Sequence, residues 1–440
     1  MLCHNLYNTV FVLRLCIVLS DKPSSQKQLK RKEHDSFDYK KHKKSQSSDK
    51  SRYELVKISL QASHQLEPNI VHTYTLNSLE DVNKFKSKVT ELSEDIQLTI
   101  IRRSSSSLIL NLKQSPLLIS KKFFKKYFTP SGVPIIKSAD EQDVALAHCF
   151  FTGDVQNQVY SMVSLNLCNG VKGTLELSNH TYMITPTIIS NKLNHHLYLM
   201  NTTNRNDELK ECGTEGAHHF SRNKNFNNST NYAKNQNKRE LNQKRPVAGY
   251  SSTTKYVEMI LVMDNSQFQR AGSIEATVVR AMTLLNHANF LLRQLDIYIA
   301  VISLEIWNDR DKIPYPEARD GSEGVNHNQL LSNLRRYRQH KLNWNLPNDN
   351  IQLFTTLDFE GSTIGLGSTE GICSQPNNGG ITSDTIEDDP IRAATTMAHE
   401  LGHNLGLKHT SAFTDEACLC EDPVDPEYTH CVMHPSSSCT

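Results

Sequence analysis

The pattern of apolar and polar positions divides the chain into two structured halves with different periods. In residues 53–200 short β-rich runs recur, among them LTIIRR (98–103), SLILNLK (107–113) and QVYSMVSLNL (158–167). Apolar and polar residues alternate in these runs, and turn residues separate them, which is typical of strands. The sequence therefore predicts a β-rich N-terminal half.

After residue 250 the pattern changes to strands that alternate with helices. Apolar runs at 255–264 and 296–307 are predicted to be buried strands, and residues 274–295 between them place apolar side chains at helical spacing. A strand, a helix and a second strand in this order form a βαβ unit, whose strands pair in parallel with a right-handed crossover. With a further helix at 329–342 and a strand at 351–357, the C-terminal half is expected to be an α/β domain.

A polar segment at residues 201–245 separates the two halves. It is rich in Asn and Lys and poor in apolar residues, so it cannot bury much surface, and we interpret it as an exposed linker. The basic pairs 238–239 and 244–245 near its end are candidate sites for a processing protease. Neither pair has an Arg four positions earlier, and Pro246 follows the second pair directly.

Charge and hydropathy narrow the class of protein. The net charge of +1 gives no case for nucleic-acid binding. Residues 10–19 are apolar except for Arg14, and we interpret residues 1–20 as a signal peptide, with a mis-assigned start or a buried strand as the alternatives. No later stretch approaches 18 apolar residues, so no transmembrane segment is expected.

Cysteines and glycosylation signals both favour an oxidising, secreted or extracellular environment. Cys149 and Cys168 flank one β-rich run, as the ends of a disulfide-bridged hairpin would. The candidate disulfide cysteines are Cys149, Cys168, Cys373, Cys418, Cys420, Cys431 and Cys439. The candidate glycosylation sites are Asn179, Asn201, Asn227 and Asn228.

The segment HELGHNLGLKH, residues 399–409, contains the side chains for a metal site. Asp389 and Pro390 suit the N-cap and the first position of a helix, and His399 and His403, four residues apart, project from the same face of that helix. Gly406 can adopt the left-handed conformation that ends a helix.

The turn at Gly406 allows His409 to return to the same point as the two helical histidines. Three neutral imidazoles with an open fourth position are typical of catalytic zinc. Glu400 lies about 100° around the helix from His399. We predict that it takes the proton of a zinc-activated water and passes it to the leaving amine.

The chain resembles a known family at these residues. HELGHNLGLKH is the zinc motif of the metzincins. Further segments resemble the adamalysin (reprolysin, ADAM) branch, namely KYVEMILVMDN, LEIWNDRDKI, STIGLGSTEGIC, CLC at 418–420 and CVM at 431–433. The segment HCFFTGDV to TYMITP, residues 148–186, resembles the pro-domain of the same family. Matrix metalloproteinases share the zinc motif but lack this cysteine set, and astacins usually carry Glu after the third histidine.

The resemblance implies a fold and a division into domains. The expected fold is α/β: a metzincin catalytic domain with a twisted, mostly parallel sheet and an active-site helix, preceded by a β-rich pro-domain. The implied domains are a signal peptide at 1–20, a propeptide at 21–200, a latency and processing linker at 201–245 and a catalytic domain at 246–440 that is incomplete at its C-terminus.

The resemblance also assigns roles to single residues. Met433 would form an apolar floor beneath the zinc ligands, and Cys212 in ELKECGTEG would act as a cysteine switch on the zinc, with a role as a disulfide partner as the alternative. Pairing of Cys149 with Cys168 and of Cys420 with Cys431 is implied in the same way. Thr410 stands where the family usually has Asp after the third histidine.

Zinc is the cofactor that the resemblance supports, and calcium is doubtful. Glu258 matches one calcium ligand of the family, Asn326 stands in place of a later Asp, and the remaining ligands would lie beyond residue 440.

The resulting expectation is the zymogen of a zinc metalloendopeptidase that cleaves extracellular or cell-surface proteins. Polypeptide substrates would lie against the strand near residues 361–371, and the chain's own propeptide would act as the inhibitor. The alternative is a poorly folded fragment or isoform that acts as a non-catalytic binding module. The presence of Glu400 favours the enzyme.

Overall fold

The computed structural model describes residues 53–200, 211–214, 254–410 and 432–434, apart from short gaps at 65–66, 104, 116–117, 159–160, 178–179, 190–191, 319–320, 322, 343–345, 373, 375–376 and 387–389. Several sequence predictions lie outside the described residues. These are the signal peptide, the basic pairs of the linker, Asp389, the four candidate glycosylation sites, and Cys373, Cys418, Cys420, Cys431 and Cys439.

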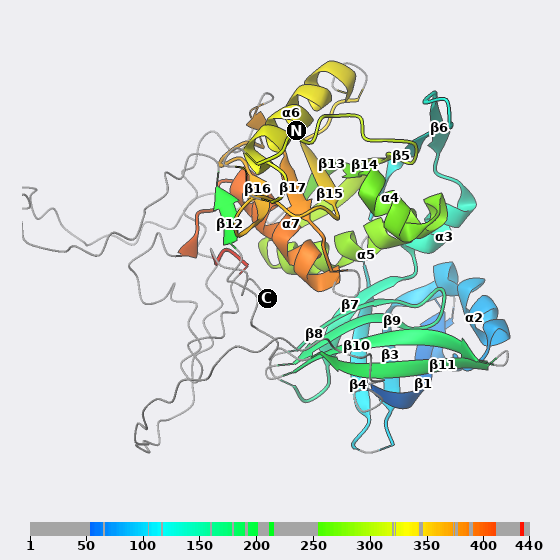
Figure 1. Cartoon of the computed structure of the whole chain (residues 1–440). Helices are drawn as coiled ribbons and strands as arrows, with labels where there is room; N and C mark the ends of the chain where they lie inside the picture. The colour runs from blue at the N-terminus through cyan, green and yellow to red at the C-terminus, as the bar shows by residue number, and fades with distance from the viewer. Residues whose placement is uncertain are drawn as a thin grey trace, which may run out of the picture.

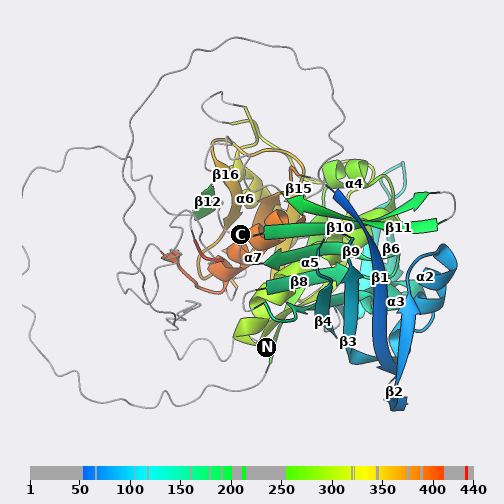
Figure 2. The same ribbon diagram turned by 90° about the horizontal axis from the view of Figure 1, so that it is seen from below.

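The N-terminal half is built on an antiparallel nine-stranded sheet in the order β11-β10-β9-β8-β7-β4-β3-β1-β2. Because β1 also pairs with β11, the sheet closes on itself and leaves β2 outside the ring (Figures 1 and 2). Its strands are β1 (Tyr53–His64), β2 (Glu67–Thr75), β3 (Leu92–Ile101), β4 (Leu108–Gln114), β7 (Phe150–Val155), β8 (Ser161–Asn166), β9 (Lys172–Leu177), β10 (His180–Ile189) and β11 (Lys192–Met200).

Alternating side chains of these strands fill the closed sheet with one apolar core. Ile58 and Leu60 of β1 and Leu98 and Ile100 of β3 are all buried, as the period-two pattern predicts. Helix α2 (Leu79–Lys86) begins at the N-cap Ser78, is followed by the short helix η1 (Val89–Glu91), and packs Phe85 into the same core. A disulfide joins Cys149 and Cys168, whose Cα atoms are 5.2 Å apart, and so closes the hairpin of β7 and β8.

The C-terminal half contains a second sheet, with eight strands in the order β12-β16-β17-β15-β13-β14-β5-β6. The pairs β13–β14, β13–β15, β15–β17, β14–β5 and β12–β16 are parallel, whereas β16–β17 and β5–β6 are antiparallel. Its strands are β5 (Ile119–Phe128), β6 (Pro134–Ser138), β12 (Glu211–Thr214), β13 (Lys255–Met263), β14 (Ile297–Ile306), β15 (Asn350–Thr355), β16 (Thr363–Gly367) and β17 (Gly380–Ser383).

Three strands of this sheet come from the N-terminal part of the chain. β5 and β6, joined to the closed sheet through α3 (Glu141–Ala147), extend the sheet beyond β14, and β12 extends it beyond β16. The sequence pattern marked residues 119–138 as part of the β-rich N-terminal half and gave no sign that they pair with the other half. The N-terminal part of the chain therefore covers both edges of the C-terminal sheet.

Helices cover both faces of the second sheet. Val257, Met259 and Leu261 of β13 face a core shared with α5 (Ile274–Leu292) and α7 (Pro390–Asn404). Ile260 and Val262, which alternate with them, face a core shared with α6 (His327–Tyr337). In Figure 1, α5 also lies between the two sheets.

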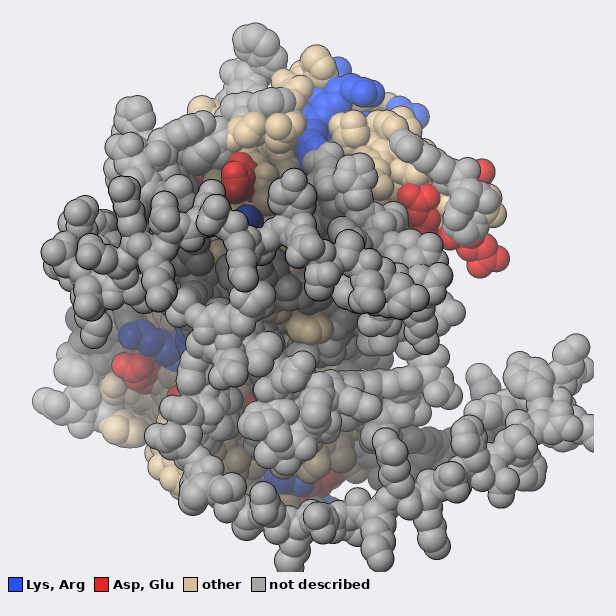
Figure 3. All heavy atoms as spheres, turned by 90° about the vertical axis from the view of Figure 1, so that its left-hand side faces the viewer, with Lys and Arg blue, Asp and Glu red and all other residues tan. Residues whose placement is uncertain are grey.

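The remaining helical segments are α4 (Asn265–Ala271), η2 (Arg293–Leu295) and a π-helical turn, η3 (Arg338–Leu342). None of the described helices has both the length and the apolar character that a membrane crossing requires. On the part of the surface that is coloured in Figure 3, basic and acidic side chains form small separate groups, in keeping with the net charge near zero.

Candidate metal centre

Helix α7 and the turn that follows it bring three histidines together. Ala394, Met397 and Leu401 pack into the core, and this anchors the helix. Gly406 has a φ of 94°, a value that glycine adopts more readily than residues with a side chain. The N–H of Leu407 donates to the carbonyl of Gly402 over 2.9 Å. The chain therefore folds back at the end of α7 and carries His409 to the two helical histidines.

The three imidazoles converge through their Nε2 atoms. His409 Nε2 lies 3.1 Å from His399 Nε2 and 3.0 Å from His403 Nε2. One ligand atom from each residue lies within 4.8 Å of the others. Among the described residues, these three histidines form the cluster of possible metal ligands. The sequence prediction of His399, His403 and His409 as one cluster agrees with this geometry.

Backbone carbonyls orient the two helical histidines. His399 Nδ1 lies 2.6 Å from the carbonyl oxygen of Val432, and His403 Nδ1 lies 2.9 Å from that of Leu407. An Nδ1–H that donates to a carbonyl leaves Nε2 with its lone pair for a metal.

Burial keeps all three rings neutral. It lowers the pKa of His403 and of His409 to about 4, and it lowers the pKa of His399 well below its ordinary value. At neutral pH the site therefore presents three uncharged nitrogen ligands.

Glu400 is fully buried beside the histidines and against strand β16. A Cβ atom on Gly365 would lie 2.6 Å from Glu400 Oε1, and one on Gly367 would lie 3.0 Å from Glu400 Oε2. Both glycines lie on the same face of β16, two residues apart, so any side chain there would collide with the carboxylate. The missing side chains thus create the space that Glu400 occupies.

Met433 is buried against helix α7 at Gly402. A Cβ atom on Gly402 would approach the Met433 sulfur to 2.6 Å, so the sulfur packs directly against the helix backbone between the two histidine turns. The N–H of Thr410 donates to the carbonyl of Met433 over 3.0 Å. The backbone of Thr410 therefore ties the third histidine to the segment that carries Met433.

A buried network of amide side chains fixes the end of α7. Asn404 donates to the carbonyls of Ser368, at 2.9 Å, and Gly379, at 3.2 Å, and it accepts from Asn350 at 2.5 Å. The N–H of Glu370 also donates to the carbonyl of His403 over 2.8 Å. The end of the histidine-bearing helix is thereby joined to the segments that follow β16 and precede β17.

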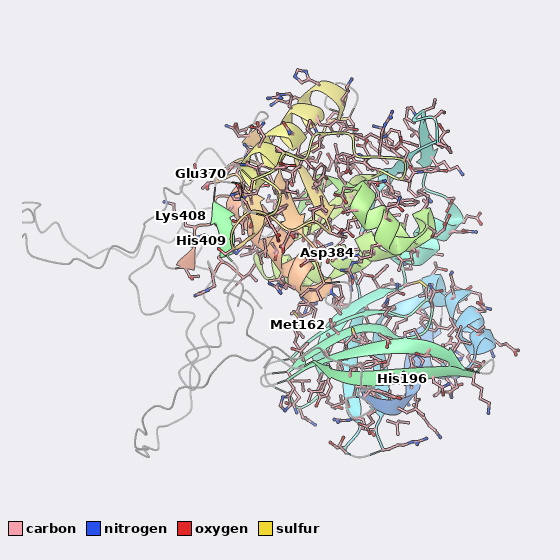
Figure 4. The ribbon with its side chains drawn as sticks, in the orientation of Figure 1. Met162, His196, Glu370, Asp384, Lys408 and His409 are labelled. Carbon is pink, nitrogen blue, oxygen red and sulfur yellow. A yellow bond between two sulfur atoms is a disulfide. The ribbon has the colours of Figure 1, made fainter. Side chains whose placement is uncertain are left out.

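The strand that carries Cys212 lies at the edge next to this site. β12 pairs with β16 in parallel, with Cys212 opposite Gly365. β12 also contacts α7, and in Figure 4 it lies beside His409 and Glu370. The backbone of Cys212 is thus in register with the residue that faces the Glu400 carboxylate.

The two residues singled out for calcium have other neighbours. The N–H of Glu258 donates to Asp349, whereas Asn326 caps α6, accepts from the N–H of Gln329 and donates to Glu360. Neither contact brings Glu258 and Asn326 together.

Sequence reasoning missed Gly365, Gly367, Gly402 and Asn404 as parts of the site. The two strand glycines carried a signal, because glycine at alternate positions of a strand marks the close approach of another group. Gly402 and Asn404 gave no such signal, because their importance depends on Met433 and on strands that are distant in the sequence.

Comparison with known proteins identifies the C-terminal half. Residues 255–440 match the family model described as Reprolysin (M12B) family zinc metalloprotease. We call these residues the reprolysin domain, after the family whose model they match. Two curated relatives match most of the chain. "Disintegrin and metalloproteinase domain-containing protein 12" from Mus musculus is 30% identical over 78% of this chain and 35% of its own length. "Zinc metalloproteinase-disintegrin-like" from Cerberus rynchops is 28% identical over 86% of this chain and 56% of its own.

The chain thus spans about a third to a half of the curated relatives that it matches. Among solved structures, "Crystal Structure of metalloproteinase-II from Bacteroides fragilis" covers 82% of this chain and 90% of its own at 13% identity, with a TM-score of 0.43.

The donor set of the reprolysin domain fits zinc. A tetrahedral zinc ion binds imidazole nitrogens at about 2.0–2.1 Å, which separates the nitrogens by about 3.3 Å. The separations of 3.0 and 3.1 Å in this domain are close to that value. His399, His403 and His409 would hold the ion, and its fourth position would stay open.

Proposed function

We propose that the chain is the zymogen of a zinc-dependent endopeptidase. The observation that carries this proposal is the convergence of three neutral histidine nitrogens beside a fully buried glutamate. A structural zinc site has four protein ligands, whereas this group has three and a carboxylate next to them, which is the composition of a hydrolytic site.

The reaction requires one contribution from the metal and several from the protein. Bound zinc would polarise the scissile carbonyl and lower the pKa of a water molecule to about 7. Glu400 accepts the proton of that water during attack and donates it to the leaving amine. The polypeptide substrate pairs with the edge of β16, which holds the scissile bond beside Glu400.

Latency is proposed to reside in β12. This strand occupies the edge of β16 that an extended substrate would need, and it carries Cys212 opposite Gly365. A thiolate on the open zinc position would exclude the attacking water. A protease that cuts the basic linker at 238–245 would separate β12 from the reprolysin domain in sequence.

The proposed location is the secretory pathway and the extracellular space, with proteins of that space or of the cell surface as substrates. The proposal is supported by the Cys149–Cys168 disulfide, which needs an oxidising compartment. The resemblance of both halves to secreted or surface proteases points in the same direction.

Peptide hydrolysis by matched wild-type and Glu400→Ala proteins tests the proposal. Residues 21–440 are produced, the linker is cut, and cleavage of a mixed peptide library is followed together with zinc content. We expect the variant to retain zinc but to lose at least about 100-fold in rate, because the proton acceptor is gone.

Equal rates in the two proteins would reject the enzyme and leave the non-catalytic binding module. A wild-type protein without zinc after production in zinc-containing medium would reject the metal centre itself.

A further inference from the structure

The outer face of the closed sheet is hollowed into a groove with a volume of about 590 Å³. Strands β1, β3, β4 and β7 form its floor, Val71 of β2 lies at one margin, and Arg293 of η2 lies at the other. Figure 2 shows β4, β3, β1 and β2 side by side in this part of the sheet. The volume lies within the range of about 300–1,000 Å³ that is usual for ligand sites.

Side chains of the four floor strands form a polar row across the groove, namely Gln61, Gln97, Asn111 and Asp154. They lie opposite one another in register, from β1 through β3 and β4 to β7. Gln97 Nε2 donates to Asn111 Oδ1 over 3.4 Å, and Asn111 Nδ2 donates to Asp154 Oδ1 over 3.1 Å. The alternating residues Ile96 and Leu112 are buried in the core of the closed sheet, so the polar row points outward.

A second set of polar side chains runs beside the polar row. Asp95, Lys113 and Thr152 lie opposite one another on β3, β4 and β7. Arg293 Nη1 donates to Thr152 Oγ1 over 3.2 Å, and the guanidinium lies 3.7 Å from the centre of the Phe290 ring. These two contacts hold Arg293 in place at the end of the groove.

The charges and the apolar side chains of the lining narrow the class of ligand. Two acidic and two basic side chains line the groove, so their formal charges cancel: Asp95, Asp154, Lys113 and Arg293. Among the described residues of the lining, Val71 is the one exposed apolar side chain. A neutral lining that is rich in hydrogen-bonding groups favours an uncharged ligand with many polar groups.

An extended peptide fits this groove poorly. A peptide that adds to a sheet pairs with a free strand edge and places alternate side chains in pockets. The strands β1, β3, β4 and β7 are each paired on both sides, so the floor offers no free edge. A ligand of the groove must therefore bind to the side chains of the floor and not to its backbone.

Sugar hydroxyl groups suit the polar row. A hydroxyl both donates and accepts hydrogen bonds, and so does a side-chain amide. An amide has two N–H donors and an oxygen with two lone pairs, so Gln97 and Asn111 keep bonding capacity beyond their contacts within the row. Neighbouring strands lie about 4.8 Å apart, which is similar to the length of one pyranose unit. Successive members of the polar row can therefore meet successive sugar units.

We propose that the groove binds an uncharged oligosaccharide. The sugar units lie along the polar row, and Val71 and Arg293 bound the site at its two ends. The inference does not depend on the proposed hydrolysis, because binding is measured without a peptide substrate.

The test titrates the uncut chain in a calorimeter with uncharged hexasaccharides of glucose, of mannose and of N-acetylglucosamine. A heparin hexasaccharide and a mixed peptide library are the charged and the polypeptide comparisons. Gln61→Leu and Asn111→Leu each replace an amide of the polar row by an apolar side chain of similar size. Asn83→Leu, at an exposed amide of α2 outside the groove, is the matched control.

We expect an uncharged hexasaccharide to bind the wild type and Asn83→Leu equally, and to bind Gln61→Leu and Asn111→Leu at least about ten-fold more weakly, because sugar hydroxyls lose their partners. Gln61 is exposed, and its substitution leaves the hydrogen bonds of Asn111 intact, so this variant keeps the test decisive if Asn111→Leu does not fold.

The proposal would be overturned by a wild type that binds none of the uncharged hexasaccharides, or by equal affinity in all variants. Tighter binding of heparin or of peptides would overturn it as well. A repeat after enzymatic removal of N-linked chains distinguishes two sources of the sugar. A gain in affinity would assign the groove to a glycan of the chain itself, and unchanged affinity would assign it to a glycan of another molecule.

Discussion

At the scale of single residues, the site depends on side chains that are missing as much as on those that are present. Gly365 and Gly367 allow the Glu400 carboxylate to lie directly on β16, and Gly402 allows Met433 to lie directly under α7. These positions need a hydrogen atom where any other residue would place a carbon. The position of the Glu400 carboxylate is therefore set by its neighbours on another element.

Gly365→Ala tests this dependence. The new methyl group would lie 2.5 Å from Thr396 Cγ2 and 2.6 Å from Glu400 Oε1, and it would displace both side chains. We expect peptide hydrolysis to fall by about 10- to 100-fold, since small misplacements of a catalytic group cost this much. Zinc content should stay near one ion per chain, because the histidines are not touched.

Thr363→Ala on the same strand is the control, since it removes atoms and adds none. Wild-type activity of Gly365→Ala would show that Glu400 does not need its place against β16.

His195 in the closed sheet predicts an acid-sensitive step in stability. Burial lowers its pKa to about 4, and its Nε2 accepts from the N–H of Val171 over 2.9 Å. Since the folded pKa lies below the ordinary value of 6.5, the unfolded chain takes up the proton first as the pH falls. The stabilisation is complete above about pH 6.5 and is lost as the pH falls to about 4.

Denaturant unfolding at pH 7 and pH 4.5 measures this effect. His195→Gln can still accept a hydrogen bond but cannot titrate. Between pH 7 and pH 4.5 its free energy of unfolding should therefore fall by less than that of the wild type, and the two falls should differ by up to about 3 kcal/mol. Acid also affects the metal centre, but it does so in both proteins. This effect cancels when their changes in unfolding free energy are subtracted. His180→Gln at an exposed position should behave like the wild type, and identical pH profiles for all three would exclude His195 as the cause.

At the scale of elements, the histidine-bearing helix α7 is positioned by strands and not by its own sequence alone. Ala394, Met397 and Leu401 attach α7 to α5 and the sheet, but these contacts do not fix the last turn of the helix. The amide network around Asn404 fixes that turn against the segments beside β16 and β17. The end of α7 and the segments that follow β16 and precede β17 therefore form one unit.

Asn404→Ala should weaken this unit. The carbonyls of Ser368 and Gly379 would lose a buried partner, at a cost of about 1–3 kcal/mol for each group left unpaired, whereas the Asn350 amide would keep its bond to Asn378. We expect a lower thermal unfolding midpoint and a weaker zinc affinity, measured by calorimetry and by competition with a chelator. Lys408→Ala, at an exposed position nearby, should change neither, and unchanged zinc affinity in Asn404→Ala would show that the network does not position the histidines.

At the scale of the whole molecule, the N-terminal part of the chain covers both edges of the reprolysin sheet. β5 and β6 lie beyond β14, and β12 lies beyond β16. Different segments of the N-terminal part therefore occupy the two edges of the same sheet.

Cys212→Ala tests the inhibitory edge. If the thiolate blocks the metal, the uncut variant should hydrolyse peptides at least about ten-fold faster than the uncut wild type, because water regains the open position. The double variant Cys212→Ala/Glu400→Ala excludes a contaminating protease, since it should be inactive. Full latency in uncut Cys212→Ala would place the inhibition elsewhere, for example in strand pairing alone.

The sequence by itself determined the local elements around the site and the meeting of its three histidines. Helical spacing placed His399 and His403 on one face, and Gly406 predicted the turn that returns His409, because these relations span only a few residues. The order of a strand, a helix and a second strand in residues 255–307 likewise predicted the parallel pairing of β13 and β14.

Only the tertiary structure decided which distant segments meet at those elements. It paired β5 with β14, set Gly365 against Glu400 and surrounded Asn404 with buried amides. Apolar periodicity shows that a face will be buried but not by what, since many partners offer the same apolar surface. The choice among them depends on the packing of the whole chain.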